Sequence, residues 1–268
     1  MKRFFGIIAV YFIASIKSKF EYRGAFIANA FGFVLGYGTQ FFLIWILVSR
    51  FNVLNGWEAF EIMLLYSLSI VSYTLANIFL GGPTRQLSEK IRTGFFDQTL
   101  ISPMHPFAYE VASSFSSYYF THFLVGISFI VICLVNLNIA LSLTQLFFLI
   151  VFIIGSALIQ GGIMLMLNTT SFWLIGDNPL ARELFMSLRQ LIEYPLSIYP
   201  RILQIVLTFI IPFGFISFYP AQYILSKNDF LMFSPMLQFL NPLVGIVIFT
   251  VALFFWNFGI RNYKSSGS

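Results

Sequence analysis

Charged side chains are scarce in this sequence. Only 9% of its 268 residues are Asp, Glu, Lys or Arg, whereas 59% are hydrophobic. A soluble domain carries roughly 25% charged residues, because water must wet its surface. Lipid must therefore be the solvent for most of this chain. The 35 Phe and 13 Tyr residues agree, because Phe is tolerated among acyl chains and Tyr collects at membrane interfaces.

Residues that bind metals or catalyse reactions are also few. The single cysteine, Cys133, lies in an apolar run, which excludes an intrachain disulfide and a C-x-x-C metal motif. His105 and His122 are far from other ligands, and we expect them to pack or to lie at an interface. Glu58 and Glu61 are expected at the outer mouth of a membrane span rather than as an acid–base pair. We predict no catalytic residue, no metal site and no cofactor bound by this chain.

Motifs for nucleotides and nucleic acids are missing as well. No G-x-x-x-x-G-K-[ST] motif occurs, and no Gly-Lys pair occurs anywhere, so this chain alone cannot hydrolyse ATP. The formal net charge of +5 could indicate nucleic acid binding. The basic residues are instead spread between apolar runs, without one patch of stacking aromatics. We therefore expect no nucleic acid partner.

Long apolar runs occupy most of the chain. A helix needs about 20 apolar residues to cross the hydrocarbon core. A further run, 202–225, also has this length but contains Pro212 and Pro220, which kink or break a helix. The other five runs of this length are 25–48, 59–80, 107–135, 143–167 and 235–260.

These runs define the expected fold. We predict an all-α integral membrane protein with six transmembrane helices in a single domain, 1–268. Helix breaks are tolerated at membrane depth only where protein or water satisfies the backbone. If the N-terminus is cytoplasmic, all of the 15 Lys and Arg residues except Arg50 and Lys227 fall on inner loops. The positive-inside rule then places both termini in the cytoplasm.

Residues 1–22 are expected to form an amphipathic helix in the inner membrane interface. A cleaved signal peptide is the alternative, but no small-x-small cleavage site follows the apolar residues. The apolar residues recur at helical spacing between basic ends: Phe5, Ile8, Phe12 and Ile16.

The most polar stretch is 81–106. Pro83 at its head and Gly94 bracket a short predicted helix, with Thr84 as a candidate N-cap.

Leu87 and Ile91 lie one turn apart in this short helix and therefore share a face. Because so short a helix is marginal alone in water, this face is expected to dock on the bilayer surface or on a cytoplasmic partner. An ordinary solvated loop is the alternative. Charged side chains cover the rest of the helix: Arg85, Glu89, Lys90 and Arg92.

The pattern IRTGFFDQTLISPMHP, residues 91–106, resembles the cytoplasmic segment after the second span in ABC-2 type ABC transporter permeases. That family has a short helix followed by a Gly, an acidic residue, a Leu and a Pro. The corresponding residues here are Gly94, Asp97, Leu100 and Pro103.

Two further stretches carry the resemblance. In SFWLIGDNPLARELF, residues 171–185, the first three residues close the fourth span. The stretch PLSIYPRILQIVLTFIIPFGFISFYPAQYIL, residues 195–225, is similar to the Pro-punctuated region before the family's last span. The chain is most similar to the subgroup of small bacterial permeases that includes the viologen exporters. The family's prolines are matched by Pro195, Pro200, Pro212 and Pro220.

The resemblance offers a second topology. It implies a re-entrant helical pair within 195–234, preceded by a fifth span over 181–200. Arg189 and Glu193 would then lie in the membrane, which is costly unless they pair at their i, i+4 spacing or face a cavity. Hydropathy alone instead makes 202–225 the fifth span, and both versions stay open here.

The resemblance also implies a function. The chain would be the permease subunit of an exporter in the bacterial cytoplasmic (inner) membrane, embedded in membrane lipid. A separate dimeric ABC ATPase subunit would bind ATP and Mg²⁺. Six spans enclose a path poorly, so a second permease, identical or related, is expected. A lipophilic or amphipathic cargo, including aromatic cations, suits the apolar spans.

Candidate site residues follow from this function. Leu87 and Ile91 would enter a groove on the ATPase, and nearby charges would fix the register. The main coupling residues would be Arg85, Leu87, Glu89, Lys90, Ile91, Arg92, Gly94, Phe95 and Asp97, with Asp177, Arg182 and Glu183 as a second contact. Polar residues within apolar runs could line the path, or could form interhelical hydrogen bonds: Asn29, Gln40, Asn77, Gln160 and Asn168.

A secondary transporter or channel without an ATPase partner is the alternative function. Such proteins usually contain buried ionisable residues and inverted repeats. No convincing repeat is present in this sequence. A membrane-embedded enzyme is a weaker alternative, because no catalytic constellation lies near an interface.

Overall fold

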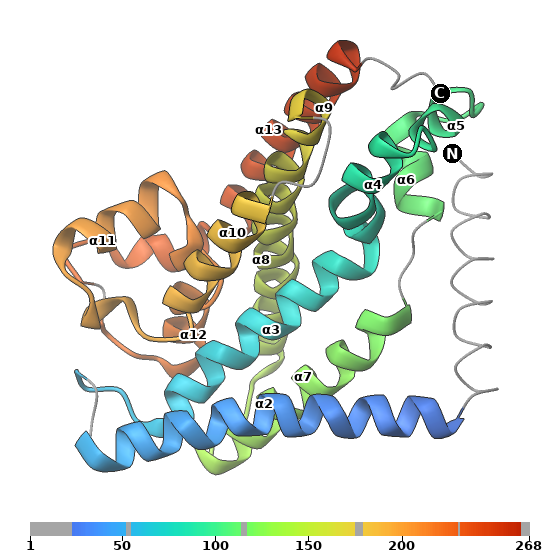
Figure 1. Cartoon of the computed structure of the whole chain (residues 1–268). Helices are drawn as coiled ribbons and strands as arrows, with labels where there is room; N and C mark the ends of the chain where they lie inside the picture. Colours follow the sequence, from blue (N-terminus) through green and yellow to red (C-terminus); the bar gives the residue numbers. More distant parts are fainter. Residues whose placement is uncertain (1–22, 52–54, 114–116, 175–178, 230, 264–268) are drawn as a thin grey trace.

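The chain is built from helices that pack into a splayed bundle (Figure 1). No strand occurs in the part of the chain that the structure describes. The predicted interfacial helix over 1–22 lies outside this part. The computed structural model describes residues 23–51, 55–113, 117–174, 179–229 and 231–263.

Five helices are long and apolar enough to cross a membrane, and a bent helix pair would make six if it counts as one span. The predicted all-α membrane fold is therefore confirmed. The long helices are α2 (Arg23–Phe51), α3 (Ala59–Gly81), α7 (Ser117–Asn136), α8 (Leu143–Thr169) and α13 (Asn241–Asn262).

Short helical elements connect these spans. Between α3 and α7 lie η1 (Gly82–Gln86), α4 (Leu87–Arg92), α5 (Phe96–Leu100) and α6 (Pro106–Ser113). Between α8 and α13 lie α9 (Ser171–Leu174), α10 (Pro179–Leu191), η2 (Leu196–Ile198), α11 (Arg201–Ile205), η3 (Val206–Ile210), η4 (Phe213–Phe215), α12 (Phe218–Leu225) and η5 (Pro235–Phe239).

The α3 helix lies at the centre of the bundle. It packs against α7 and α8, and α8 in turn packs against α13. The most apolar part of the α3 span is 89% buried, whereas the corresponding parts of α2 and α13 are 17% and 22% buried. The hydroxyls of Ser67 and Ser72 donate to Met63 and Leu68 carbonyl oxygens one turn earlier, which satisfies them inside the core. The apolar faces of α2 and α13 are left for lipid or a second subunit.

Glycines allow α8 and α13 to pack at close range. A Cβ atom placed on Gly245 would lie 2.5 Å from the Gly155 carbonyl oxygen, so only glycine fits this crossing. Further along, Gly162 faces Ile248, and Gly259 faces the end of α8. The two helices therefore run in the same direction with small residues between them, as expected for close packing in membranes.

A buried amide strengthens the same crossing. Asn241 begins α13 and donates from Nδ2 to the Ser156 hydroxyl at 2.8 Å and to the Phe215 carbonyl oxygen at 2.5 Å. The Ser156 hydroxyl donates to the Ile216 carbonyl oxygen at 2.8 Å. The start of α13 is thus joined to α8 and to the backbone between η4 and α12.

Two predicted span boundaries were wrong. The run 107–135 is divided, because α6 ends at Ser113 and the apolar span covers Tyr118–Asn136. The run 235–260 begins with a separate 3₁₀ turn, and its span starts at Asn241. Pro242 lies in the first turn of α13. A backbone N–H group has no partner within the helix at this position, so proline, which lacks that group, is tolerated.

Neither candidate for the fifth span is an unbroken transmembrane helix. The pair Arg201–Ile210 and Phe213–Leu225 bends by 78° around Pro212, as the proline predicted. The α10 helix within the other candidate ends at Leu191 and has 13 residues. At 1.5 Å per residue it extends about 20 Å, short of the roughly 30 Å hydrocarbon core. The choice between the two topologies stays a prediction.

A polar latch holds the start of α3 to the chain after α12. Lys227 Nζ lies 2.5 Å from Glu61 Oε2 and 4.7 Å from the centre of the Trp57 ring. The indole N–H of Trp57 donates to Asp229 at 2.7 Å. Glu61 is therefore one partner of an ion pair, and the loop that carries Lys227 is fixed to the bundle.

Candidate functional site

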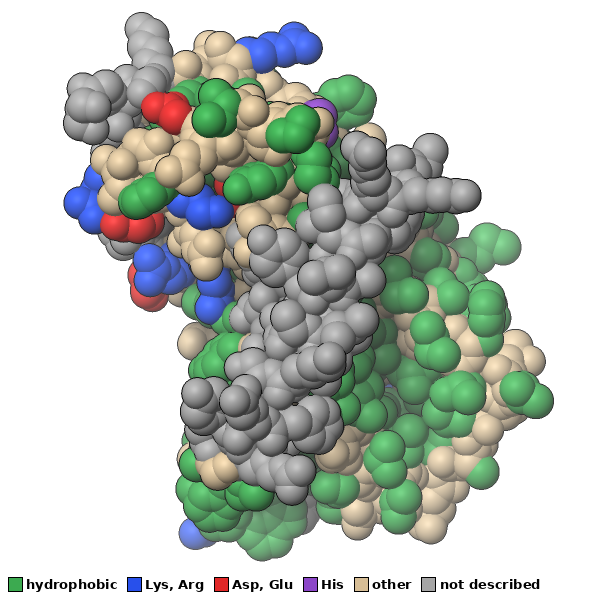
Figure 2. All heavy atoms as spheres, turned by 90° about the vertical axis from the view of Figure 1, so that its right-hand side faces the viewer, with side chains coloured by type: hydrophobic (Ala, Val, Ile, Leu, Met, Phe, Trp, Pro, Cys, Tyr) green, Lys and Arg blue, Asp and Glu red, His purple; other side chains and the backbone are tan. Residues whose placement is uncertain are grey.

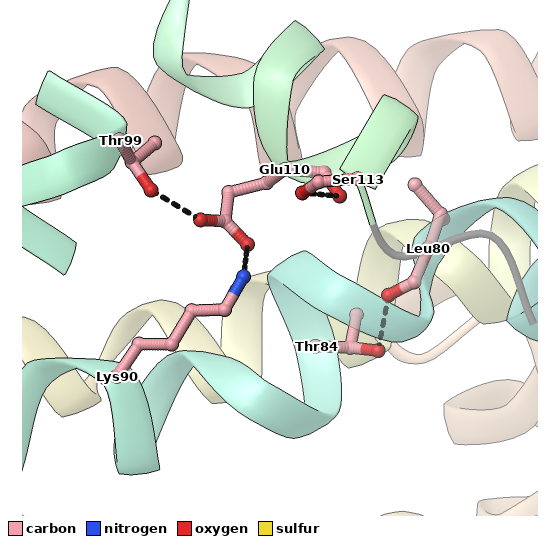
Figure 3. A network of polar contacts seen from close by, with 6 residues as sticks. All are labelled: Leu80, Thr84, Lys90, Thr99, Glu110 and Ser113. Atoms are coloured by element: carbon pink, nitrogen blue, oxygen red, sulfur yellow. Dashed lines mark hydrogen bonds and ion pairs between the residues drawn. The ribbon is translucent and has the colours of Figure 1, made fainter. Parts of the chain in front are cut away.

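The polar segment after α3 is continuous with that helix. The backbone is helical from Ala59 to Arg92, through the π-helical turn η1. Pro83 lacks an N–H group and its ring crowds the preceding turn, and a π turn provides the extra room. Thr84 donates its hydroxyl to the Leu80 carbonyl oxygen (Figure 3). The prediction that Thr84 caps a separate helix was therefore wrong.

The end of this helix matches the prediction. The α4 helix stops at Arg92, and the Thr93 N–H donates to the Glu89 carbonyl oxygen. Gly94 follows with φ of +73°. Glycine adopts this left-handed conformation without steric cost, which is why it terminates helices.

Leu87 and Ile91 share a face, as their spacing predicted, but that face is buried within this chain. Their exposed fractions are 0% and 1%. They form one apolar cluster with residues of α5, α8, α9 and α13: Phe96, Leu165, Phe172, Ala252 and Trp256.

The prediction that Leu87 and Ile91 enter a groove on a partner was therefore wrong. The short helix needs a partner for its apolar face, and the ends of α8 and α13 provide it within the same chain. Two fully buried aliphatic side chains gain roughly 3–6 kcal/mol from burial. That free energy stabilises the fold of the segment.

An ion pair joins α4 to α6 (Figure 3). Lys90 Nζ lies 2.7 Å from Glu110 Oε2, and the Thr99 hydroxyl donates to Glu110 Oε1 at 2.6 Å. The Glu110 side chain is fully buried, whereas Lys90 is 22% exposed. Lys90 is thus fixed within the chain. Sequence reasoning missed Glu110, although a carboxylate inside a predicted span was a signal for a functional or structural role.

The segment is also tied to the end of α13. The Tyr263 hydroxyl donates to Asp97 Oδ1 at 3.0 Å. The Phe96 ring lies with its centre 5.1 Å from those of Phe172 and Tyr263, in edge-to-face geometry. The segment 81–113 is therefore one body with the adjoining ends of α8 and α13.

The opposite face of the segment is open. Glu89 and Arg92 form a surface ion pair at 2.7 Å with about 60% of each side chain exposed. Phe95 is 59% exposed. Charged side chains gather at this end of the molecule, above a largely apolar face (Figure 2). Between α4, α5 and α6 lies a hollow of about 420 Å³ lined by Gln86, Glu89, Lys90, Thr93, Phe95, Gln98, Thr99, Tyr109 and Ser113.

The remaining predicted coupling residues are spread out. Arg85 donates to the Tyr73 hydroxyl at 3.0 Å and lies 4.5 Å from the centre of the Tyr119 ring, so it is directed toward α3 and α7. Arg182 and Glu183 are exposed on α10. Asp177 lies outside the described residues.

The structure does not gather the predicted path residues. Asn77 and Gln160 are fully buried between α3 and α8. Gln160 Nε2 donates to the Ser69 carbonyl oxygen at 3.2 Å and to the Ser72 hydroxyl at 2.7 Å. Side chains without exposure cannot line a path between two subunits, so these two favour interhelical hydrogen bonding.

The other path candidates lie apart from these. Asn29 is exposed on α2, and Asn168 donates to the Met164 carbonyl oxygen of its own helix. Gln40 Nε2 donates to Glu193 Oε2 at 3.1 Å.

Two embedded charges near α10 do not pair with each other. Glu193 is 9% exposed, and no ion pair within 4.0 Å joins it to another residue of the described chain. Arg189 instead places its guanidinium 4.4 Å from the centre of the Tyr73 ring. Of the two ways in which their cost could be offset, an i, i+4 ion pair is therefore not formed, although the charge of Arg189 still acts on Glu193. Each is held by a different helix, Glu193 by α2 and Arg189 by α3.

These features define a multi-pass helical membrane protein whose polar segment is built into the end of its transmembrane core. Among the described residues, no group of three or more His, Cys, Asp or Glu side chains could hold a metal ion. A family model described as ABC-2 family transporter protein matches residues 34–267. The chain therefore belongs to this family and is the membrane permease component of an ABC transporter.

This match confirms the resemblance found in the sequence. No curated protein and no solved structure matches the chain. Permeases of this family work with an ABC ATPase, generally as dimers. Similarity to the viologen exporters within the family stays a prediction.

Proposed function

We propose that this chain is the permease subunit of an exporter in the bacterial cytoplasmic membrane, driven by a separate ATPase that binds ATP and Mg²⁺. The cargo is lipophilic or amphipathic, including organic cations. The segment 81–113 faces the cytoplasm, and both termini lie on that side. A second permease, identical or related, completes the path.

The distribution of basic residues supports this orientation. Arg85, Lys90 and Arg92 lie at the α4–α6 end of the bundle, the end that the positive-inside rule assigns to the cytoplasm. At the other end Lys227 is paired with Glu61, which neutralises its charge. Arg50 at the end of α2 is then one exception on the outer side. Arg201 is a second, because it follows Ser197, whose carbonyl oxygen accepts a hydrogen bond from Asn55 in the loop before α3.

The segment has one buried face and one open face, and this difference supports a contact between the open face and the ATPase. Leu87 is buried in the core, whereas Glu89 and Phe95 line the hollow and the exposed Arg92 pairs with Glu89. An ATPase can bind the open face without unfolding the buried one. Because Asp97 is bonded to the end of α13, a displacement of the segment reaches the spans directly.

A charge swap tests this contact. Glu89→Arg with Arg92→Glu keeps an oppositely charged i, i+3 pair on α4 but exchanges the charges that a partner meets. With the ATPase co-expressed, we expect the swap to reduce co-purification and cargo-stimulated ATP hydrolysis at least fivefold. The melting temperature should stay within about 2 °C, because exposed pairs contribute only about 0.2–1 kcal/mol.

A second variant tests the aromatic side chain on the same face. Phe95→Asp should also uncouple hydrolysis from cargo while membrane insertion survives. Met236→Asp is the matched control, because Met236 is 74% exposed in η5 at the other end of the bundle. Full coupling in both the charge swap and Phe95→Asp would reject the proposed contact.

Glu193 supports the inclusion of cations among the cargo. Burying a carboxylate in a membrane domain is costly unless an opposite charge compensates it. The charge of Arg189 does so in part, and a cargo cation would add a second compensating charge. Aromatic rings of this region could stack on such a cargo.

Glu193→Gln separates cationic from neutral cargo. We expect stimulation of the ATPase by hydrophobic cations to fall severalfold, while stimulation by neutral lipophilic compounds persists. Glu58→Gln, an exposed carboxylate at the start of α3, is the control. Equal stimulation by cations in the wild type and Glu193→Gln would remove cations from the proposed cargo.

A further inference from the structure

A second hollow lies where the end of α13 meets the chain before α6. Its volume is about 440 Å³. The wall from α13 contains both aromatic and basic side chains, and the chain before α6 closes the other side. The lining residues are His105, Pro106, Phe254, Asn257, Phe258, Ile260 and Arg261.

The polar part of this lining favours an anion. Arg261 and His105 are both exposed, and no carboxylate lines the hollow. Among the described residues, no hydrogen bond or ion pair engages either of these side chains. Asn257 adds an amide donor beside them. These donors match the oxygens of a phosphate group, for which arginine is especially suited.

The apolar part favours a hydrocarbon chain. Phe254 and Phe258 lie one turn apart on α13 and are 72% and 57% exposed. They continue the outward apolar face of α13, on which Val247 and Val251 are also about half exposed. An acyl chain attached to a bound phosphate would therefore lie along this face.

We propose that this hollow binds the head group of an anionic phospholipid, with an acyl chain along α13. Basic pockets next to transmembrane helices on the cytoplasmic side are suited to such head groups. Arg261 and His105 hold the phosphate, and Phe254 and Phe258 contact the acyl chain. The leaflet is the inner one if the proposed orientation is correct, but the binding itself does not require that orientation.

The site also joins parts that carry the coupling segment. His105 directly precedes α6, whose Glu110 is bonded to Lys90 of α4. Phe107 of α6 packs with its ring centre 5.7 Å from that of Trp256 in α13. A lipid held between His105 and Arg261 therefore braces α6 against α13 from the membrane side.

Native mass spectrometry of the purified chain tests the site without any ATPase. The chain in detergent is titrated with phosphatidylglycerol or with phosphatidylcholine. We expect the anionic lipid to bind more tightly to the wild type. Arg261→Gln with His105→Gln should weaken its binding at least about fivefold, because an arginine near an anionic head group contributes about 1 kcal/mol and the substitution also removes the imidazole donor. Binding of phosphatidylcholine should not change.

Controls separate the site from general attraction between basic residues and lipid. Arg50→Gln removes an exposed arginine at the far end of α2 and should leave binding unchanged. Phe254→Ala with Phe258→Ala should weaken binding of both lipids through the acyl chain. Unchanged binding of phosphatidylglycerol to the Arg261 and His105 variant would overturn the proposal. Displacement of the lipid by millimolar inorganic phosphate would also overturn it, since a free anion would then be the preferred ligand.

Discussion

Lys90 and Glu110 form an ion pair across α4 and α6, with 2.7 Å between Nζ and Oε2 and with the carboxylate fully buried. Thr99 of α5 donates to the other carboxylate oxygen. One acidic side chain thus joins three short helices, α4, α5 and α6. None of these helices is long enough to be stable alone in water. Their arrangement therefore depends on this carboxylate together with the apolar cluster beneath it.

Removing one partner of this pair should be more harmful than removing both. Lys90→Met leaves the buried Glu110 carboxylate without its cation, at a cost of about 3–5 kcal/mol. The double variant Lys90→Met with Glu110→Leu should recover most of the lost stability, because no charge remains buried. Thermal unfolding in detergent, followed by size-exclusion chromatography, measures both. A double variant no more stable than Lys90→Met would contradict this account.

Leu87→Ala should destabilise the fold rather than a contact with a partner. The side chain has no exposure, so its truncation leaves a cavity and costs about 2–5 kcal/mol. Arg92→Ala on the exposed face is the control and should cost less than about 1 kcal/mol. Unfolding midpoints of the purified chain provide the comparison. If Leu87→Ala kept full stability and lost only ATPase coupling, the buried position of Leu87 would be wrong.

Gly245→Val should disrupt the crossing of α8 and α13. A side chain there would meet the backbone of Gly155, and overpacking of this kind costs about 1–3 kcal/mol or more. Gly36→Val on α2 is a matched control, because nothing lies within 4 Å of a Cβ at that position. We expect a clear loss of folded yield and melting temperature only for Gly245→Val. Similar losses for both variants would indicate a general intolerance of valine in these spans.

Gln160→Leu tests whether this amide acts in packing or in transport. It removes the hydrogen bonds to Ser69 and Ser72 between α8 and α3. Such bonds in membrane proteins contribute about 0.6 kcal/mol on average, so a small loss of stability is expected. The ranking of cargo compounds in an ATPase stimulation assay should stay the same. A changed ranking would place Gln160 in the path after all.

The transmembrane spans were largely predictable because the thickness of the bilayer sets the length of an apolar run. The run 59–80 matches α3, and 143–167 matches most of α8. The exact start of α7 was not predictable from hydropathy. The apolar residues of α6 have the same hydropathy as lipid-facing residues, although α6 belongs to the polar segment. Glu110 was the one residue that marked the difference, and its ion pair requires tertiary contacts to be seen.

The candidate site was predicted in part. Helical periodicity correctly placed Leu87 and Ile91 on one face, but periodicity does not tell which surface covers that face. The cover comes from Trp256, which lies about 165 residues further along the chain. The continuation of α3 through Pro83 was missed for a related reason. Proline usually ends a helix, and only the surrounding packing makes a widened turn preferable to a break.

The uninterrupted helix from Ala59 to Arg92 has 34 residues and a length of about 50 Å, well beyond the hydrocarbon core. No non-helical loop interrupts it, so a displacement at one end can be transmitted to the other through α3 and the π turn η1. One end carries Glu89, and the other carries Glu61, which forms an ion pair with Lys227. A displacement at the first end is thus expected to strain the Lys227–Glu61 ion pair at the second.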